Sequence, residues 1–304
     1  MILLHIDVSP ACDSFYAIRG ESMGIYSFRL KALAAAATAL SFAAISTPAP
    51  AQPLQPTSSW NVDYAENECR LVRDFGQDGN KIWLSFSAGA SFTHYSMVIA
   101  SPSFSTTNRF TDIEIKATPL GDTKTVNAMP YSIELNGKKN QVFRLGIERA
   151  FFSNVNKDQV IEFKVKSGKT FELNANGLQK ALEALNSCHD DLLTNKFKID
   201  VTALHALQSL PLPGDGVASW VTTDDFPPAA IRDRWEGQTQ FVMTVGTDGK
   251  AKDCRTITSS GHAILDQRAC DLMIQRGKFT PAKGANGEPV AAPWISRVHW
   301  QIPR

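Results

Sequence analysis

The chain has 304 residues, which is enough for two domains of ordinary size. Its 31 basic and 30 acidic side chains leave a formal charge of +1 at pH 7. The basic residues form no stripe along the sequence, whereas a nucleic-acid-binding surface needs one. We therefore exclude nucleic acid as a partner and expect an ordinary folded protein.

The N-terminal segment is typical of an exported protein. Arg29 and Lys31 form a basic flank, residues 32–45 are apolar or small, and Ala49-Pro50-Ala51 fits a signal-peptidase site before Gln52. The apolar run is well short of the roughly 20 residues that a membrane-spanning helix needs. Cleavage after Ala51 is therefore expected, and an uncleaved anchor in the inner membrane is the alternative.

Met23 stands at a suitable distance before this signal, so we predict it as the true start, with residues 1–22 upstream of it. The predicted location is the periplasm, with no stable transmembrane anchor after cleavage.

Four segments follow from these patterns: an upstream segment and signal peptide at 1–51, a β-rich domain at 60–195, a linker at 196–219 and a C-terminal domain at 220–304.

Residues 60–195 are predicted to form a β-rich domain closed by one helix. Apolar residues alternate with polar ones around residues 82–86 and 161–166, and Asn136-Gly137 is a hairpin-turn signal. A helix is expected after Asn176, with an apolar stripe formed by Leu178, Leu182, Leu185, Cys188 and Leu192. The function of this domain stays open.

Cys12 falls in the predicted leader, so four cysteines remain in the exported chain: Cys69, Cys188, Cys254 and Cys270. An even number in an oxidising compartment predicts disulfide bonds, and the domain boundaries favour Cys69 with Cys188 and Cys254 with Cys270. Buried free thiols are the alternative. A metal site at Cys188-His189-Asp190-Asp191 is disfavoured, because neighbouring residues on a helix point in different directions. We expect no metal and no cofactor.

Residues 196–219 are proline- and glycine-rich and are predicted to be a linker. After it, Phe226-Pro227 starts a short helix, and a strand pattern through Phe241 turns at Thr247-Asp248-Gly249 into a second strand at 251–258. A helix to about Arg276 and a last strand over 294–302 follow. These elements predict an α+β fold whose C-terminal domain is a three-stranded antiparallel sheet with helices on one face.

The order and spacing of the marks in this region resemble the C-terminal domain of the TonB energy-transducer family, over about 218–304. The motifs that carry this resemblance are Phe226-Pro227-Pro228-Ala229-Ala230, Gly237, Asp248-Gly249, Ser259-Ser260-Gly261, Leu265-Asp266, Phe279, Pro281 and Ala282. The resemblance implies a non-enzymatic periplasmic module that binds an extended segment of outer-membrane TonB-dependent receptors by strand addition, in TonB-dependent transport. The sequence lacks the long proline-rich arm and the anchor of classical transducers, which weakens the inference of energy transmission and leaves the binding inference intact.

An edge strand offers unpaired main-chain groups that a partner strand can use. We expect the last strand to be that edge. Its predicted partner-binding side chains, facing water, are Ile295, Arg297, His299 and Gln301. The alternate set, expected to hold the sheet to the helix, is Trp294, Val298, Trp300 and Ile302.

Ser259 or Ser260 with His262 and Asp266 has the composition of a hydrolase triad, but the serines lie at a helix start and no Gly-x-Ser-x-Gly elbow is present. Helix capping explains them, so no catalytic residue is predicted.

Two other functions stay open. One is an envelope adaptor or sensor whose C-terminal module serves only protein binding or homodimerisation. The other, less favoured, is an envelope hydrolase.

Overall fold

The structure is a computed structural model that describes residues 3–7, 52–77, 79–89, 92–104, 110–118, 123–135, 138–153, 159–166, 170–214 and 217–302. The predicted signal peptide, the predicted start at Met23 and the Asn136-Gly137 turn lie outside the described residues. Within the described part, no helix is long and apolar enough to cross a membrane.

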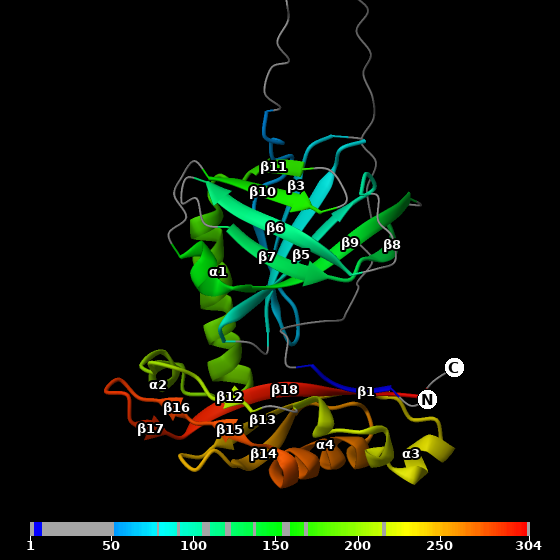
Figure 1. The fold of residues 1–304 in the computed structure, drawn as a ribbon, viewed down its shortest axis with the longest axis vertical. Coiled ribbons are helices and arrows are strands. Elements are labelled where there is room, and N and C mark those ends of the chain that lie inside the picture. The colour runs from blue at the N-terminus through cyan, green and yellow to red at the C-terminus, as the bar shows by residue number, and fades with distance from the viewer. Residues whose placement is uncertain are drawn as a thin grey trace, which may run out of the picture.

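The β-rich domain consists of two antiparallel sheets that face each other (Figure 1). The six-stranded sheet has the order β2-β3-β4-β5-β9-β8, and the four-stranded sheet has the order β11-β10-β6-β7. Phenylalanine and aliphatic side chains from both sheets form one buried core, which includes Phe86, Phe143 and Phe163. The strands are β2 Asn61–Tyr64, β3 Cys69–Phe75, β4 Ile82–Ala88, β5 His94–Ser101, β6 Thr111–Thr118, β7 Thr123–Ala128, β8 Tyr131–Leu135, β9 Lys138–Glu148, β10 Val160–Val165 and β11 Thr170–Asn174.

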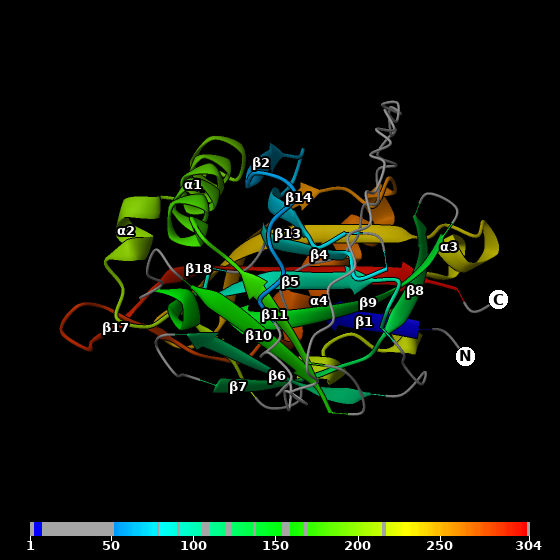
Figure 2. The ribbon, with the colours of Figure 1, turned by 90° about the horizontal axis from the view of Figure 1, so that it is seen from above.

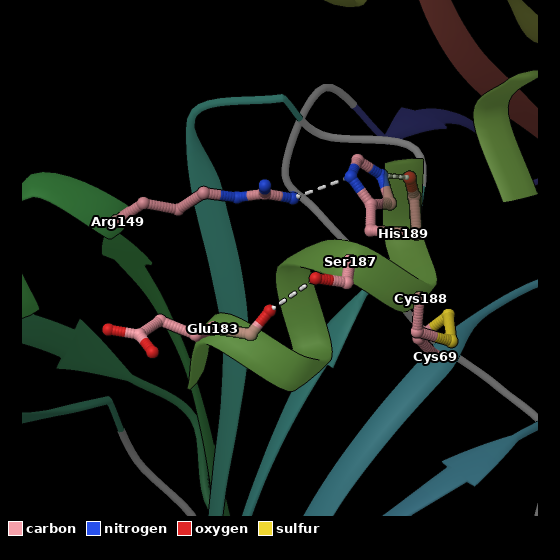
Figure 3. The surroundings of a disulfide bond; sticks show 7 residues. Cys69, Arg149, Glu183, Ser187, Cys188 and His189 are labelled. Atoms are coloured by element: carbon pink, nitrogen blue, oxygen red, sulfur yellow. Dashed lines mark hydrogen bonds between the residues drawn. A yellow bond between two sulfur atoms is a disulfide. The ribbon is translucent and has the colours of Figure 1, made fainter. Parts of the chain in front are cut away.

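Helix α1, Leu178–Asp191, packs on β2, β3 and β4. Its predicted apolar stripe is buried from Leu178 to Cys188. Cys188 is bonded to Cys69 at the start of β3, with the two Cα atoms 6.1 Å apart (Figure 3). This bond fastens the helix to the sheet across a separation of 119 residues.

The C-terminal sheet has four strands in the order β1-β18-β13-β14. Three of them belong to the predicted domain: β13 Gly237–Val245, β14 Ala251–Thr258 and β18 Ala292–Gln301. The fourth is β1, Leu3–Asp7, from the far end of the chain. Helix α4, Ala263–Arg276, covers one face of the sheet (Figure 1). A disulfide bond joins Cys254 of β14 to Cys270 of α4.

The turn between β13 and β14 depends on a glycine. Gly249 has a φ of +72°, in the left-handed region. Its amide donates to the Gly246 carbonyl at 3.0 Å, and its own carbonyl accepts from the Phe279 amide at 2.9 Å. A Cβ atom at this position would lie 2.3 Å from the Phe279 carbonyl oxygen. The Asp-Gly hairpin signal is therefore also a point of close approach between two main chains.

The segment between the two domains packs along the C-terminal module. Its strand β12, Leu212–Pro213, pairs with β15, Phe279–Thr280, and the amides of Gln208 and Ser209 donate to the Lys283 carbonyl. The remaining short elements are η1 Arg149–Phe152, η2 Leu192–Lys196, α2 Val201–His205, η3 Val217–Ser219, η4 Thr223–Asp225, α3 Pro228–Arg232, β16 Ala282–Lys283 and β17 Pro289–Val290.

A small apolar cluster connects the two domains. Leu193 and Phe197, which follow α1, are buried together with Val242 of β13 and Ile295 of β18. Arg255 of β14 also donates a hydrogen bond to the Phe197 carbonyl. Figure 1 shows α1 reaching down from the β-rich domain to the sheet, and Figure 2 shows α1 and α2 on the same side of the molecule. The face of the C-terminal sheet opposite α4 is thus partly covered by the end of the β-rich domain.

Candidate partner-binding edge

Strand β18 has a different neighbour on each side. On one side it pairs with β13 from Ala292 to Trp300. On the other side it pairs with β1 in antiparallel register over Arg297–Gln301, with His5 opposite His299. The edge that the sequence singles out for strand addition therefore carries an added strand in this structure, contributed by the chain itself (Figure 1).

One face of β18 lies in the core of the module. Trp294, Val298 and Trp300 are buried there against α4, and Ile302 packs at its border. The Trp300 ring meets Phe226 edge-on at 5.5 Å between ring centroids. These are the side chains that the alternation in the sequence assigns to the helix side.

Asp266 connects the elements on this face of the sheet through hydrogen bonds. One carboxylate oxygen accepts from the Thr239 hydroxyl at 2.8 Å and the Ser260 amide at 2.9 Å, and the other accepts from the Ser259 hydroxyl at 2.5 Å. The Trp300 Nε1–H donates in turn to Thr239 at 3.0 Å. Burial favours the neutral acid, but these hydrogen bonds outweigh it and lower the pKa of Asp266. The network connects β18, β13 and the start of α4.

Neither Ser259 nor Ser260 forms a hydrolase triad with His262 and Asp266. The His262 ring stacks on Trp235, with ring centroids 4.7 Å apart. The Ser260 hydroxyl donates to the main-chain carbonyl of His262 at 3.2 Å, and the Ser259 hydroxyl donates directly to Asp266. The arrangement orders the turn before α4 and does not activate a serine, because activation needs a hydroxyl bonded to the imidazole.

The other face of β18 differs from expectation at two of its four predicted partner-binding residues. Ile295 and Arg297 are each only 7% exposed, so the prediction that they face water is wrong. Ile295 packs in the cluster between the domains, which alternation along a single strand cannot reveal. His299 is half-buried and Gln301 is exposed. Whether these four side chains bind a partner stays a prediction.

A buried ion cluster supports the module and was missed by sequence reasoning. Asp225 is 4% exposed and accepts from Arg276 at 2.6 and 2.9 Å and from Arg268 at 2.7 Å. It also accepts from the Thr222 hydroxyl at 2.9 Å. Burial raises its pKa, and the bonds from Arg276 and Thr222 lower it further than burial raises it, so that the net pKa of Asp225 lies below its usual value.

Asp225 does not cap α3, which begins at Pro228 without a side-chain cap. The sequence feature that could have indicated this ion cluster lies on α4. Arg268 and Arg276 lie eight positions apart, about two helical turns, so both project from nearly the same side. Both side chains are only about one-third exposed, which favours an anionic partner such as the buried carboxylate of Asp225.

Residues 223–302 match the family model of the Gram-negative bacterial TonB protein C-terminal. The match confirms the resemblance predicted for about 218–304. The family is a non-enzymatic, periplasm-facing interaction domain that generally interacts with outer-membrane receptors. The match assigns residues 223–302 to a TonB-like C-terminal domain. No curated protein and no solved structure matches the chain significantly.

Proposed function

We propose that the protein is an exported, periplasmic TonB-like binding protein whose β18 edge takes up an extended segment of an outer-membrane receptor. The observation that carries this proposal is the antiparallel pairing of β1 with Arg297–Gln301. A five-residue strand from a distant part of the chain occupies this edge, so its main-chain groups can accept an added strand. The matched family supplies the class of partner.

The support of β18 suits this role. Its inner face is fixed to α4 through Trp300, Thr239 and Asp266, and its outer face is braced by the cluster around Ile295. An edge held on both faces keeps the geometry of its main-chain groups before a partner arrives. Such preorganisation lowers the entropic cost of binding.

The same proposal explains the role of β1. Residues 3–7 fall upstream of both the predicted start at Met23 and the predicted cleavage site after Ala51. In the mature protein that we propose, β1 is therefore absent and the outer edge of β18 is open to a receptor segment. A chain that retains residues 3–7 has its own competitor for that edge.

The decisive experiment measures binding of receptor-derived peptides to residues 52–304 and to the full 304-residue chain. We expect the shorter protein to bind and the full chain to bind at least tenfold more weakly, because β1 must first leave. Equal affinity of both proteins would show that the peptides bind elsewhere. A parallel size measurement separates peptide binding from pairing of β18 edges in a homodimer, which is the adaptor alternative.

A proline substitution tests the edge directly. Arg297→Pro removes one main-chain N–H and fixes φ, so it should weaken peptide binding much more than Arg297→Ala. The comparison is made only if the far-UV spectrum and melting midpoint of Arg297→Pro match those of the parent. A folded Arg297→Pro protein with parental affinity would remove the edge from consideration. Loss of binding in a folded Trp300→Ala protein would instead assign the contact to the opposite face.

A further inference from the structure

A cavity of about 250 Å³ lies where the β-rich domain meets the segment that leads into the C-terminal module. Its walls come from η1, the end of α1, α2 and residues 207–210. The side chains that matter for its chemistry are Phe92, Arg149, His189, Asp190, Leu204 and Leu207. The cavity thus combines one cation, one carboxylate and several apolar groups.

Arg149 is held in position by its neighbours. Its Nη2 donates to Nδ1 of His189 at 3.1 Å (Figure 3). Its Nη1 donates to the side-chain carbonyl oxygen of Asn186 at 3.3 Å. The guanidinium carbon also lies 4.9 Å from the centre of the Tyr95 ring. These contacts fix a planar, permanently charged group at the cavity wall.

His189 orients Arg149 without adding charge. The ring is 1% exposed, and its Nε2–H donates to the Gly89 carbonyl at 2.7 Å, so Nδ1 is the acceptor for Arg149. Burial, followed by the nearby charge of Arg149, lowers the pKa of His189 to about 3. The imidazole is therefore neutral at any physiological pH, and Arg149 keeps its positive charge at the cavity.

The rest of the lining limits the ligand. Asp190 also faces the cavity, where its carboxylate lies 3.5 Å from Nε2 of His205. This carboxylate repels a phosphate or other multiply charged anion more strongly than a single carboxylate, which can accept a charge-assisted hydrogen bond from Arg149. Phe92, Leu204 and Leu207 offer apolar surface for a compact body of a few carbon atoms.

We propose that this cavity binds a small monocarboxylate with a compact apolar body, with the carboxylate on Arg149 and the apolar part against Phe92, Leu204 and Leu207. The site is separate from the β18 edge and does not depend on the function proposed for that edge. Residues 207–210 form one wall, and the amides of Gln208 and Ser209 donate to Lys283 of the C-terminal module. A ligand here would therefore contact the connection between the two domains.

The test uses the 304-residue chain at pH 7 and four probes with one carbon skeleton: 4-methylpentanoate, leucine, 4-methylpentanamide and leucinamide. Calorimetric titration should give dissociation constants below about 1 mM for at least one carboxylate, with its amide binding roughly tenfold more weakly. Tighter binding of leucine than of 4-methylpentanoate assigns the site to amino acids, through Asp190, and the reverse assigns it to simple acids. No binding by either carboxylate, or amides that bind equally well, would overturn the proposal.

Two variants locate the site. Leu207→Trp fills the cavity from its partly exposed wall and should abolish carboxylate binding. Leu212→Trp places the same side chain five positions away on an exposed residue outside the cavity and should leave binding unchanged. Arg149→Lys keeps the charge but loses the planar fork, so we expect at least tenfold weaker binding with an unchanged fold. Unaltered affinity in a folded Leu207→Trp protein would place any binding elsewhere and refute the site.

Discussion

The β-rich domain and the C-terminal module differ in the bonds that connect distant parts of their chains. In the β-rich domain, one disulfide closes a separation of 119 residues and fastens α1 to β3. In the module, the disulfide spans only 16 residues, and the sheet and its surroundings take in segments from outside, namely β1 and β12. The β-rich domain is thus held together mainly by contacts among its own residues. The module instead pairs with strands from outside it, β1 along the edge of β18 and β12 along β15.

This difference accounts for how easily each region can be recognised. The module is marked by turns and caps that follow one another over a short stretch, such as Asp248-Gly249 and the serines before α4. The strands of the β-rich domain repeat alternation without a distinctive turn order. A sandwich of this kind is compatible with many functions, so its architecture alone assigns none.

The largest effect that we predict contrasts the two disulfides. Replacing Cys69 and Cys188 by serine should destabilise the β-rich domain by about 4 kcal/mol, because the unfolded chain regains a long loop; replacing Cys254 and Cys270 should cost the module about 3 kcal/mol. Chemical denaturation followed by tryptophan fluorescence and by far-UV spectroscopy measures both. If the short disulfide proved the more important one, loop entropy would not explain the contrast.

The second prediction separates the two domains. Ile295→Ala removes a buried side chain from the cluster with Val242, Leu193 and Phe197, which should cost about 2–3 kcal/mol and uncouple the unfolding of the domains. The matched control is Ile274→Ala on α4, where the side chain is 49% exposed and the change should cost less than about 0.5 kcal/mol. Equal effects of both substitutions in calorimetric unfolding would show that the cluster does not couple the domains.

The third prediction concerns the ion cluster of the module. Asp225→Asn leaves Arg268 and Arg276 without their carboxylate, so it should lower the stability of the module by about 2 kcal/mol. The β-rich domain should be unaffected. Asp224→Asn, on an exposed neighbour, is the control. An unchanged midpoint for Asp225→Asn would mean that the two arginines find other anions at no cost.

The smallest effect is a pH dependence confined to the module. Asp225 and Asp266 have lowered pKa values in the folded protein, so in acid the unfolded state takes up protons first. Their contribution is complete above the unfolded pKa of about 4 and is lost as the pH falls below it, by at most about 1.4 kcal/mol per pH unit for each group. Melting curves from pH 6 to pH 3 should show this decline, and Asp225→Asn should flatten it. A parallel decline in Asp225→Asn would assign the effect to other carboxyl groups.

Local patterns in the sequence were sufficient for β13, β14, α4 and β18, for the inner face of β18 and for the two cysteine pairings. They were sufficient because turns, caps and alternation depend on neighbouring residues, and because an even set of cysteines divides naturally between two domains. The glycine at 249 illustrates this, since its turn conformation is required by the hairpin itself.

What covers each surface was decided only by the tertiary structure. Alternation along β18 shows that Ile295 and Arg297 share a face, but not that the end of the β-rich domain packs against that face at Ile295. Nor can it show that residues 3–7 pair with the edge of β18, that Asp225 meets two arginines of α4, or that Arg149 and His189 meet beside a cavity. Each of these contacts joins residues far apart in the chain, and periodicity within one element carries no information about the partner that will cover it.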